Sequence, residues 1–236
     1  MYISTMENKK RYFFKPFVGG SYKKGLFNGK KVMILGASFY CIDKDCKFYE
    51  ACTSPYTRRT KEFEKLCPDY PISEHPEHEL SEDGARSYNK FYKFMAQYLE
   101  NRGVGDIPDF DTFWDKVTFT NYVQYMIGNR TTTLQSDVSA DDLVAFCDVI
   151  DEFEPDIVFV WGCVVNRPIK YKESDEDDPN FNNDFDGSEY RHDLFHWQFH
   201  GRKITFLNCY HPSYGKFSNA EEQEKMFKCI DEAFGE

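Results

Sequence analysis

Four segments of the chain are apolar enough to form buried β-strands. Residues 31–35 (KVMIL) and 156–162 (DIVFVWG) contain continuous apolar runs, which are typical of parallel strands covered on both faces. Residues 116–123 (KVTFTNYV) and 203–210 (KITFLNCY) are rich in β-branched and aromatic residues. The pattern therefore predicts four buried strands, and the first of them ends at Gly36.

Apolar residues at helical spacing predict three helices around these strands. In 81–103 they form one aromatic-rich face. The segment 139–155 opens with a serine and two aspartates, as a helix N-terminus does, and 219–234 repeats the apolar pattern near the end of the chain. Alternating strands and helices predict an α/β fold, a three-layer α/β/α sandwich with a short, mainly parallel central sheet. We expect one domain over residues 1–236.

A strict alternation of aromatic and polar residues precedes the last strand. Phe195, Trp197 and Phe199 alternate with polar residues, and the sequence HGRK follows before the last strand begins. Period two is the pattern of a half-buried strand. The segment therefore predicts a β-hairpin that leads into the last strand.

Composition places the chain among soluble folded proteins. Hydrophobic residues make up 41% and aromatic residues 18% of its 236 residues, which is enough for one sizeable core. No apolar run approaches the ~18–20 residues of a membrane span, and the N-terminus lacks the apolar stretch of a secretory signal. We expect a cytoplasmic protein with no membrane partner.

The net charge of −11 is concentrated in one segment. Residues 173–189 hold eight acidic residues and no basic ones, so the rest of the chain carries only −3. This polar segment is expected to be a mobile loop. The nearly neutral remainder does not support tight nonspecific binding to DNA, but it leaves room for a local contact.

Each predicted strand ends in a distinctive group of residues. GASFYC (36–41) follows the first strand, TNY (120–122) closes the second, the third ends at Gly162, and YHPS (210–213) follows the fourth. In open parallel sheets, ligands bind outside the carboxyl ends of the strands. These segments are therefore expected to share one crevice. The alternative is four unrelated loop starts, because such residues are common in loops.

The order of these motifs resembles the uracil-DNA glycosylase superfamily. GASFY, TNY, PDIVFVWG and YHPSYGKF follow the family's order over residues 31–217, and RTTT (130–133) fits its layout. The resemblance implies a uracil-DNA glycosylase-like fold. It also implies hydrolysis of the N-glycosidic bond of a damaged or noncanonical base in DNA, which is a DNA-repair reaction. Such enzymes extrude the nucleotide and read its base in a pocket.

The resemblance also implies roles for individual residues. His211 matches the catalytic histidine, which donates a hydrogen bond to the departing base. Asn121 matches the base reader, and Ser213 lies in the loop that grips phosphate. The first motif corresponds to Gly36, Ala37, Ser38, Phe39 and Tyr40, and Tyr40 matches the aromatic residue that limits the size of the pocket.

The first motif departs from the family where the family activates water. The expected carboxylate or amide would stand at Ala37 or Ser38, but the first has only a methyl group and the second only a hydroxyl. Phe39 replaces the expected proline. Ser38 is kept as the catalytic candidate at this position. The alternative function is a noncatalytic module that binds nucleic acid, a nucleotide or a protein partner in the same crevice.

Four cysteines gather in a short stretch after the first strand. Cys41, Cys46, Cys52 and Cys67 have the spacing C-x4-C-x5-C-x14-C. Four thiolates can hold a structural zinc ion or, less favoured here, an iron–sulfur cluster. The alternative is four free thiols in a loop-rich insertion, since the spacing lacks a tight C-x2-C pair. Neither reading requires a cofactor for catalysis.

Overall fold

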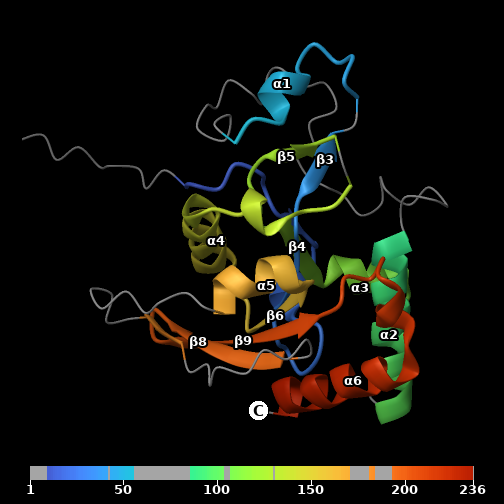
Figure 1. Ribbon diagram of the computed structural model, residues 1–236. Helices are drawn as coiled ribbons and strands as arrows, with labels where there is room; N and C mark the ends of the chain where they lie inside the picture. Colours follow the sequence, from blue (N-terminus) through green and yellow to red (C-terminus); the bar gives the residue numbers. More distant parts are fainter. Residues whose placement is uncertain are drawn as a thin grey trace, which may run out of the picture.

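A seven-stranded β-sheet forms the centre of the part of the chain described by the computed structural model (Figure 1). The structure describes residues 10–41, 43–55, 86–103, 107–129, 131–170, 181–183 and 193–235. The strand order is β1-β4-β2-β6-β9-β8-β7. The four predicted strands lie side by side at its centre: β4 (Val117–Asn121), β2 (Val32–Gly36), β6 (Ile157–Trp161) and β9 (Arg202–Cys209).

These four central strands all run parallel. Antiparallel strands flank them on both sides: β1 (Phe17–Val18) pairs with β4, and β8 (Asp193–Phe199) pairs with β9. The predicted hairpin is thus confirmed, and its turn at His200 and Gly201 has positive φ at both residues. The sequence predicts a mixed α/β fold with a mainly parallel central sheet, and this is what the chain forms.

The acidic segment 173–189 falls mostly outside the described residues. Its exception is β7 (Phe181–Asn183), which pairs antiparallel with β8 at the edge of the sheet. A loop over the whole segment was therefore the wrong expectation for these three residues. Backbone pairing with an open sheet edge overrides their polar composition.

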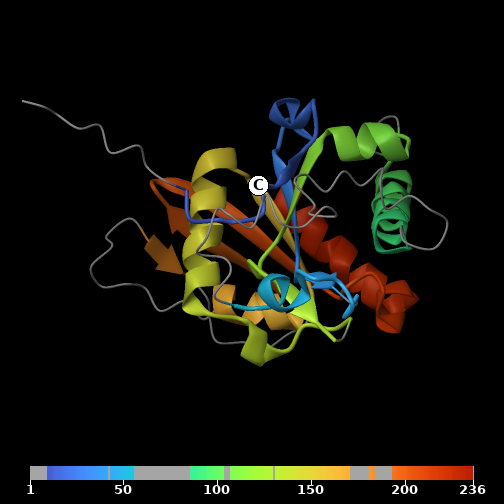
Figure 2. The ribbon, with the colours of Figure 1, turned by 90° about the horizontal axis from the view of Figure 1, so that it is seen from above.

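Helices cover both faces of the sheet (Figure 2). On one face, α2 (Arg86–Arg102), α3 (Phe110–Asp115) and α6 (Ala220–Gly235) enclose an aromatic-rich core. On the other face lie α4 (Ala140–Phe153) and α5 (Cys163–Lys170). Among the described residues, no helix combines the length and the apolar character needed to cross a membrane.

In the described part of the chain, three short 3₁₀ turns lie between these elements: η1 (Tyr22–Lys24), η5 (Gln135–Asp137) and η6 (Gly215–Ser218). The predicted helix start at Ser139 is confirmed, because its backbone N–H and its hydroxyl both donate to Asp142 Oδ2 at 2.8 Å. The Asp142 carboxylate thus satisfies the backbone donor of the residue that precedes the helix.

A small second sheet lies beyond the ends of the central strands (Figure 1). There β3 (Phe39–Cys41) pairs parallel with β5 (Met126–Gly128), and α1 (Tyr49–Cys52) packs nearby. Phe14, Phe39, Cys52 and Met126 form the buried cluster of this layer. The sequence pattern did not predict this sheet, because strands of three residues are too short to show period-two alternation.

An N-terminal strap, residues 10–14, crosses to α4. Arg11 donates to both carboxylate oxygens of Asp148, with guanidinium contacts of 2.9 and 2.6 Å. Tyr12 donates to Glu152 at 2.8 Å. The backbone N–H groups of Phe13 and Phe14 donate to Oε1 of Gln124, so the strap ends on a single buried amide.

Gln124 ties this strap to the end of β4. Its Nε2 donates to the backbone carbonyls of Asn121 and Tyr122 at 3.0 and 3.3 Å. Its own backbone N–H donates to Oδ1 of the fully buried Asp142. The buried side chain of Gln124 thus joins the strap to the end of β4, and the backbone N–H of Gln124 joins both to the start of α4.

We predict that Gln124→Leu lowers the free energy of unfolding by about 2–4 kcal/mol, because it leaves buried backbone groups without partners. Urea denaturation measures this change. The matched control is Gln135→Leu, at an exposed position, which should change stability by less than about 0.5 kcal/mol. Equal effects of the two substitutions would show that Gln124 is not a structural centre.

Candidate functional site

The four central strands end at a common edge. Gly36 is the register partner of Asn121, and Trp161 is the register partner of Cys209. The first-motif residues, the TNY motif, Gly162 and the YHPS motif therefore all leave the sheet on the same side. This is the edge at which open parallel sheets bind ligands.

Gly36 is the point of closest approach at this edge. A Cβ atom there would collide with Oδ1 of Asn121 and lie 3.0 Å from the Phe119 ring. The Asn121 carboxamide therefore rests directly against the backbone of β2, which only glycine permits. Asn121 is 6% exposed, and within the described residues its side chain has no hydrogen-bond partner.

Gly162 turns the chain from β6 into α5. Its φ is +97°, a conformation that residues with side chains rarely adopt, and its N–H donates to the carbonyl of Cys209 at 2.8 Å. A Cβ atom at Gly162 would be in van der Waals contact with His211, at 3.8 Å from its Cβ. His211 thus stands over the end of β6.

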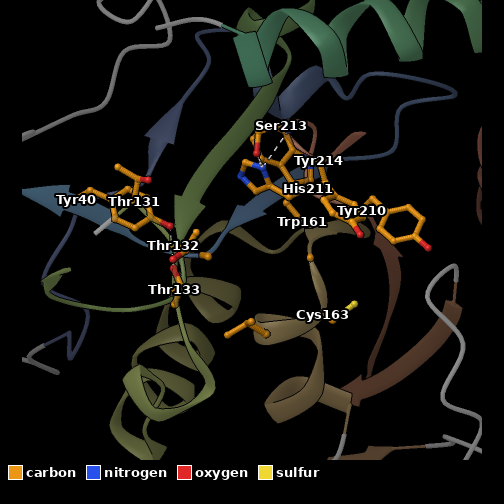
Figure 3. A pocket seen from close by; sticks show the side chains of 13 residues that line it. Tyr40, Thr131, Thr132, Thr133, Trp161, Cys163, Tyr210, His211, Ser213 and Tyr214 are labelled. Atoms are coloured by element: carbon orange, nitrogen blue, oxygen red, sulfur yellow. Dashed lines mark hydrogen bonds between the residues drawn. The ribbon is translucent and has the colours of Figure 1, made fainter. Parts of the chain in front are cut away.

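A cavity of about 420 Å³ opens at this edge (Figure 3). Its size is within the usual range for small-molecule sites. One wall comes from Tyr40 and the threonine run, and the facing wall comes from the YHPS segment and Trp161. The lining residues are Ala37, Tyr40, Thr131, Thr132, Thr133, Trp161, Gly162, Cys163, Val164, Tyr210, His211, Ser213 and Tyr214, and none of these is Asp, Glu, Lys or Arg.

The hydrogen bonds of His211 define its tautomer. The backbone N–H of Ser213 donates to Nδ1 at 3.2 Å, and the Ser213 hydroxyl lies 2.7 Å from the same atom. Because Nδ1 accepts, the proton of the neutral ring is on Nε2. The ring packs edge-on against Trp161 at 5.6 Å between centroids. Burial lowers the pKa of His211 to about 4, so the imidazole is neutral at pH 7.

His211 therefore offers Nε2–H as a donor. Within the described residues, no group accepts a hydrogen bond from this atom. A neutral imidazole that donates through Nε2 can polarise a carbonyl oxygen or stabilise negative charge on a ligand atom. The resemblance to the glycosylase superfamily implies a donor of this kind at His211, and that role stays a prediction.

Two hydroxyl groups of the opposite wall, those of Thr133 and Tyr40, form a hydrogen-bonded chain with the Ser38 hydroxyl behind them. Thr133 Oγ1 lies 2.5 Å from Ser38 Oγ and 2.9 Å from the Tyr40 hydroxyl. Ser38 is buried, whereas 39% of Tyr40 is exposed. The wall that faces His211 is thus built from neutral hydrogen-bonding groups (Figure 3).

The structure divides the predicted site residues into two groups. Ala37, Tyr40, His211 and Ser213 line the cavity together. Four others lie at the same edge but outside the lining, and they are Gly36, Ser38, Phe39 and Asn121. Phe39 packs instead on Phe14, at 4.3 Å between ring centroids, in the second sheet.

Sequence reasoning missed the threonine wall and the start of α5. Thr131, Thr132 and Thr133 were noted only as part of the layout, although three consecutive hydroxyl residues after a strand were a usable signal. The apolar neighbours of Cys163 in the sequence predict a core thiol, but Cys163 is exposed and lines the cavity. Its neighbours in sequence are apolar and continue the strand pattern, so the sequence does not indicate that a helix starts after Gly162.

The cysteine hypothesis is only partly within the described residues. Cys41 and Cys46 are half-buried and Cys52 is buried beside the second sheet, while Cys67 lies outside the described ranges. In the described part of the chain, no group of three His, Cys, Asp or Glu residues could hold a metal ion. Cys41, Cys46 and Cys52 do not form such a group by themselves, and zinc stays a prediction.

Comparison with known proteins adds no family assignment. No protein-family model matches the chain, and the search of curated proteins finds no match.

The half-buried His211, whose pKa is lowered in the folded chain, predicts a pH-dependent stability. Its pKa falls from about 6.5 in the unfolded chain to about 4 in the folded one, so between these values the unfolded chain binds the proton more tightly. The free energy of unfolding should therefore decrease as pH drops from 6.5 to 4. In His211→Asn, which does not titrate, urea denaturation should show a decrease smaller by about 1 kcal/mol or more. An unchanged pH dependence in this variant would contradict the burial of the ring.

The cysteine spacing predicts about one zinc ion per chain, which elemental analysis of the purified protein measures. Cys52→Ser should abolish the bound zinc if the four thiolates hold it. Protein free of both zinc and iron would leave the four residues as ordinary thiols.

Proposed function

We propose that this protein is uracil-DNA glycosylase-like: it takes an extruded base from DNA into the cavity and hydrolyses the N-glycosidic bond. The observation that carries the proposal is the neutral His211, whose Nε2–H is free at the wall of the cavity. Cleavage leaves negative charge on the departing base, and a fixed donor beside a base oxygen stabilises that charge without reorganisation. The same donor would recognise the carbonyl of a bound base.

Two further features support a base as the ligand. The cavity lies between an aromatic pair, Trp161 and Tyr210, and a wall of hydroxyl groups, which suits a flat ring with polar edges. The described lining carries no charged side chain at pH 7, so a neutral ring enters without leaving a charge unpaired. The sugar and phosphates would stay outside, near the exposed Ser213.

Asn121 would read the base from the neighbouring position. Its carboxamide is on the same sheet face as Phe119 and Trp161, and it has a donor and an acceptor to offer. It lies outside the lining of the empty cavity. Contact with a base therefore requires the ligand to reach past Ala37 toward Gly36.

A second candidate function is noncatalytic recognition of a base, and a specific observation favours it. Water activation needs a base near the sugar, but Ala37 offers a methyl group and Ser38 is already hydrogen-bonded to Thr133. An oxocarbenium-like transition state also gains from a nearby carboxylate, and the described lining supplies none. A reader of bases in nucleic acid, or a nucleotide binder, needs neither group.

Oligonucleotides separate the two candidates. Single- and double-stranded DNA with one uracil or hypoxanthine is incubated with the protein, and alkali then cleaves any abasic site. We expect strand breaks with one of these bases and a loss of about 100-fold in His211→Asn, the cost of removing one fixed donor. The matched control is His200→Asn, because His200 lies in the exposed hairpin turn and asparagine tolerates its positive φ.

Each result of this experiment decides between the proposals. Breaks that persist in His211→Asn would contradict the catalytic role of His211. No breaks, together with fluorescence-anisotropy binding that weakens in His211→Asn alone, would establish the noncatalytic reader. Neither breaks nor binding would remove both proposals and favour a protein partner.

A further inference from the structure

Thr133 holds together two segments that are far apart in the sequence. Its Oγ1 atom contacts Ser38 Oγ at 2.5 Å and the Tyr40 hydroxyl at 2.9 Å, across more than 90 residues of chain. Ser38 and Tyr40 follow β2, whereas Thr133 follows β5. Figure 3 shows Thr133 and Tyr40 on the side of the cavity opposite His211. The contact therefore lies at the wall of the cavity.

Tyr40 depends on this contact for its orientation. The backbone of Tyr40 is fixed by pairing with Ile127, but its side chain is 39% exposed. Within the described residues, its hydroxyl bonds only to Thr133 and no aromatic ring packs against it. An exposed side chain on a fixed backbone has several rotamers of similar energy. One hydrogen bond thus selects the rotamer that lines the cavity.

Ser38 supplies the fixed end of the chain of hydroxyls. It is 7% exposed, so packing holds its position, and it holds Thr133 in turn. Three hydroxyl groups carry three hydrogens, and the two contacts use two of them. When Ser38 donates to Thr133 and Thr133 donates to Tyr40, the third hydrogen is on the exposed Tyr40 hydroxyl and can be donated to a ligand. Core packing thus fixes Ser38, Ser38 positions Thr133, and Thr133 positions Tyr40.

We infer that Thr133 is a specificity-determining residue, which fixes the ring of Tyr40 as the wall that limits the size of the bound base. The inference rests on the proposed function for the identity of the ligand. The hydrogen bonds of Thr133 with Ser38 and Tyr40, which we call the clamp, do not depend on any ligand. It also gives Ser38 a positioning role in place of the activation of water.

The clamp is tested without a ligand by nitration of tyrosine with tetranitromethane, with peptide mapping by mass spectrometry. In Thr133→Val, which keeps the shape and removes the hydroxyl, Tyr40 should be nitrated about fivefold faster, as expected from the loss of one neutral hydrogen bond. Tyr214, which is 50% exposed and bonds to neither residue, serves as the reference in the same molecule.

Two further variants make this result specific. Thr133→Ser restores the hydroxyl and should restore the slow nitration of Tyr40, which also decides the matter if Thr133→Val folds poorly. Thr131→Val, a change in the same wall at a residue that makes no hydrogen bond to Ser38 or Tyr40, should leave Tyr40 nitration unchanged. Equal nitration of Tyr40 in Thr133→Val and the unmodified protein would overturn the inference.

The effect on specificity is measured with oligonucleotides that carry uracil or 5-iodouracil. Thr133→Val and Tyr40→Phe should each reduce the preference for the smaller base about tenfold, and the double variant should reduce it no further, because both remove the same bond. Additive effects would overturn the clamp. If the unmodified protein binds neither base, the proposed function fails, while the nitration experiment still decides the role of Thr133.

Discussion

No side chain fits between the last residue of β2 and the carboxamide of Asn121. This steric constraint at Gly36 brings two parallel strands together at the point where both end. Backbone hydrogen bonds continue past the strand ends, because the N–H groups of Tyr122 and Val123 donate to the carbonyls of Gly36 and Ala37. The first motif and the TNY motif therefore leave the sheet as one unit. The lining of the cavity begins with Ala37, one residue farther on.

The site combines a polar chemistry with an environment that carries little charge. Burial keeps His211 neutral, and Ser213 directs its proton to Nε2. Facing it, three hydroxyl groups bond to one another. Such a cavity gains little from ionised ligands and favours neutral rings with hydrogen-bonding edges. A described lining without a carboxylate therefore still suits the recognition of such a ring.

The central strands and long helices were predictable because their patterns are local. The apolar runs at 31–35 and 156–162 fix β2 and β6, and the serine and aspartates at 139–142 fix the start of α4. The hydroxyl chain was not predictable, because the bond from Ser38 to Thr133 joins residues 95 positions apart. The positions of Asn121 and Phe39 relative to the cavity depend on packing and register, which one sequence does not reveal.

The strap at residues 10–14 has a consequence for how the chain assembles. Arg11 is made before its partner Asp148, which follows 137 residues later. Closing so long a loop costs conformational entropy. The contacts that offset this cost exist only after α4 has formed and Gln124 is in place. The strap should dock last, after the sheet has formed. The first described residues of the chain would then be the last to reach their native contacts.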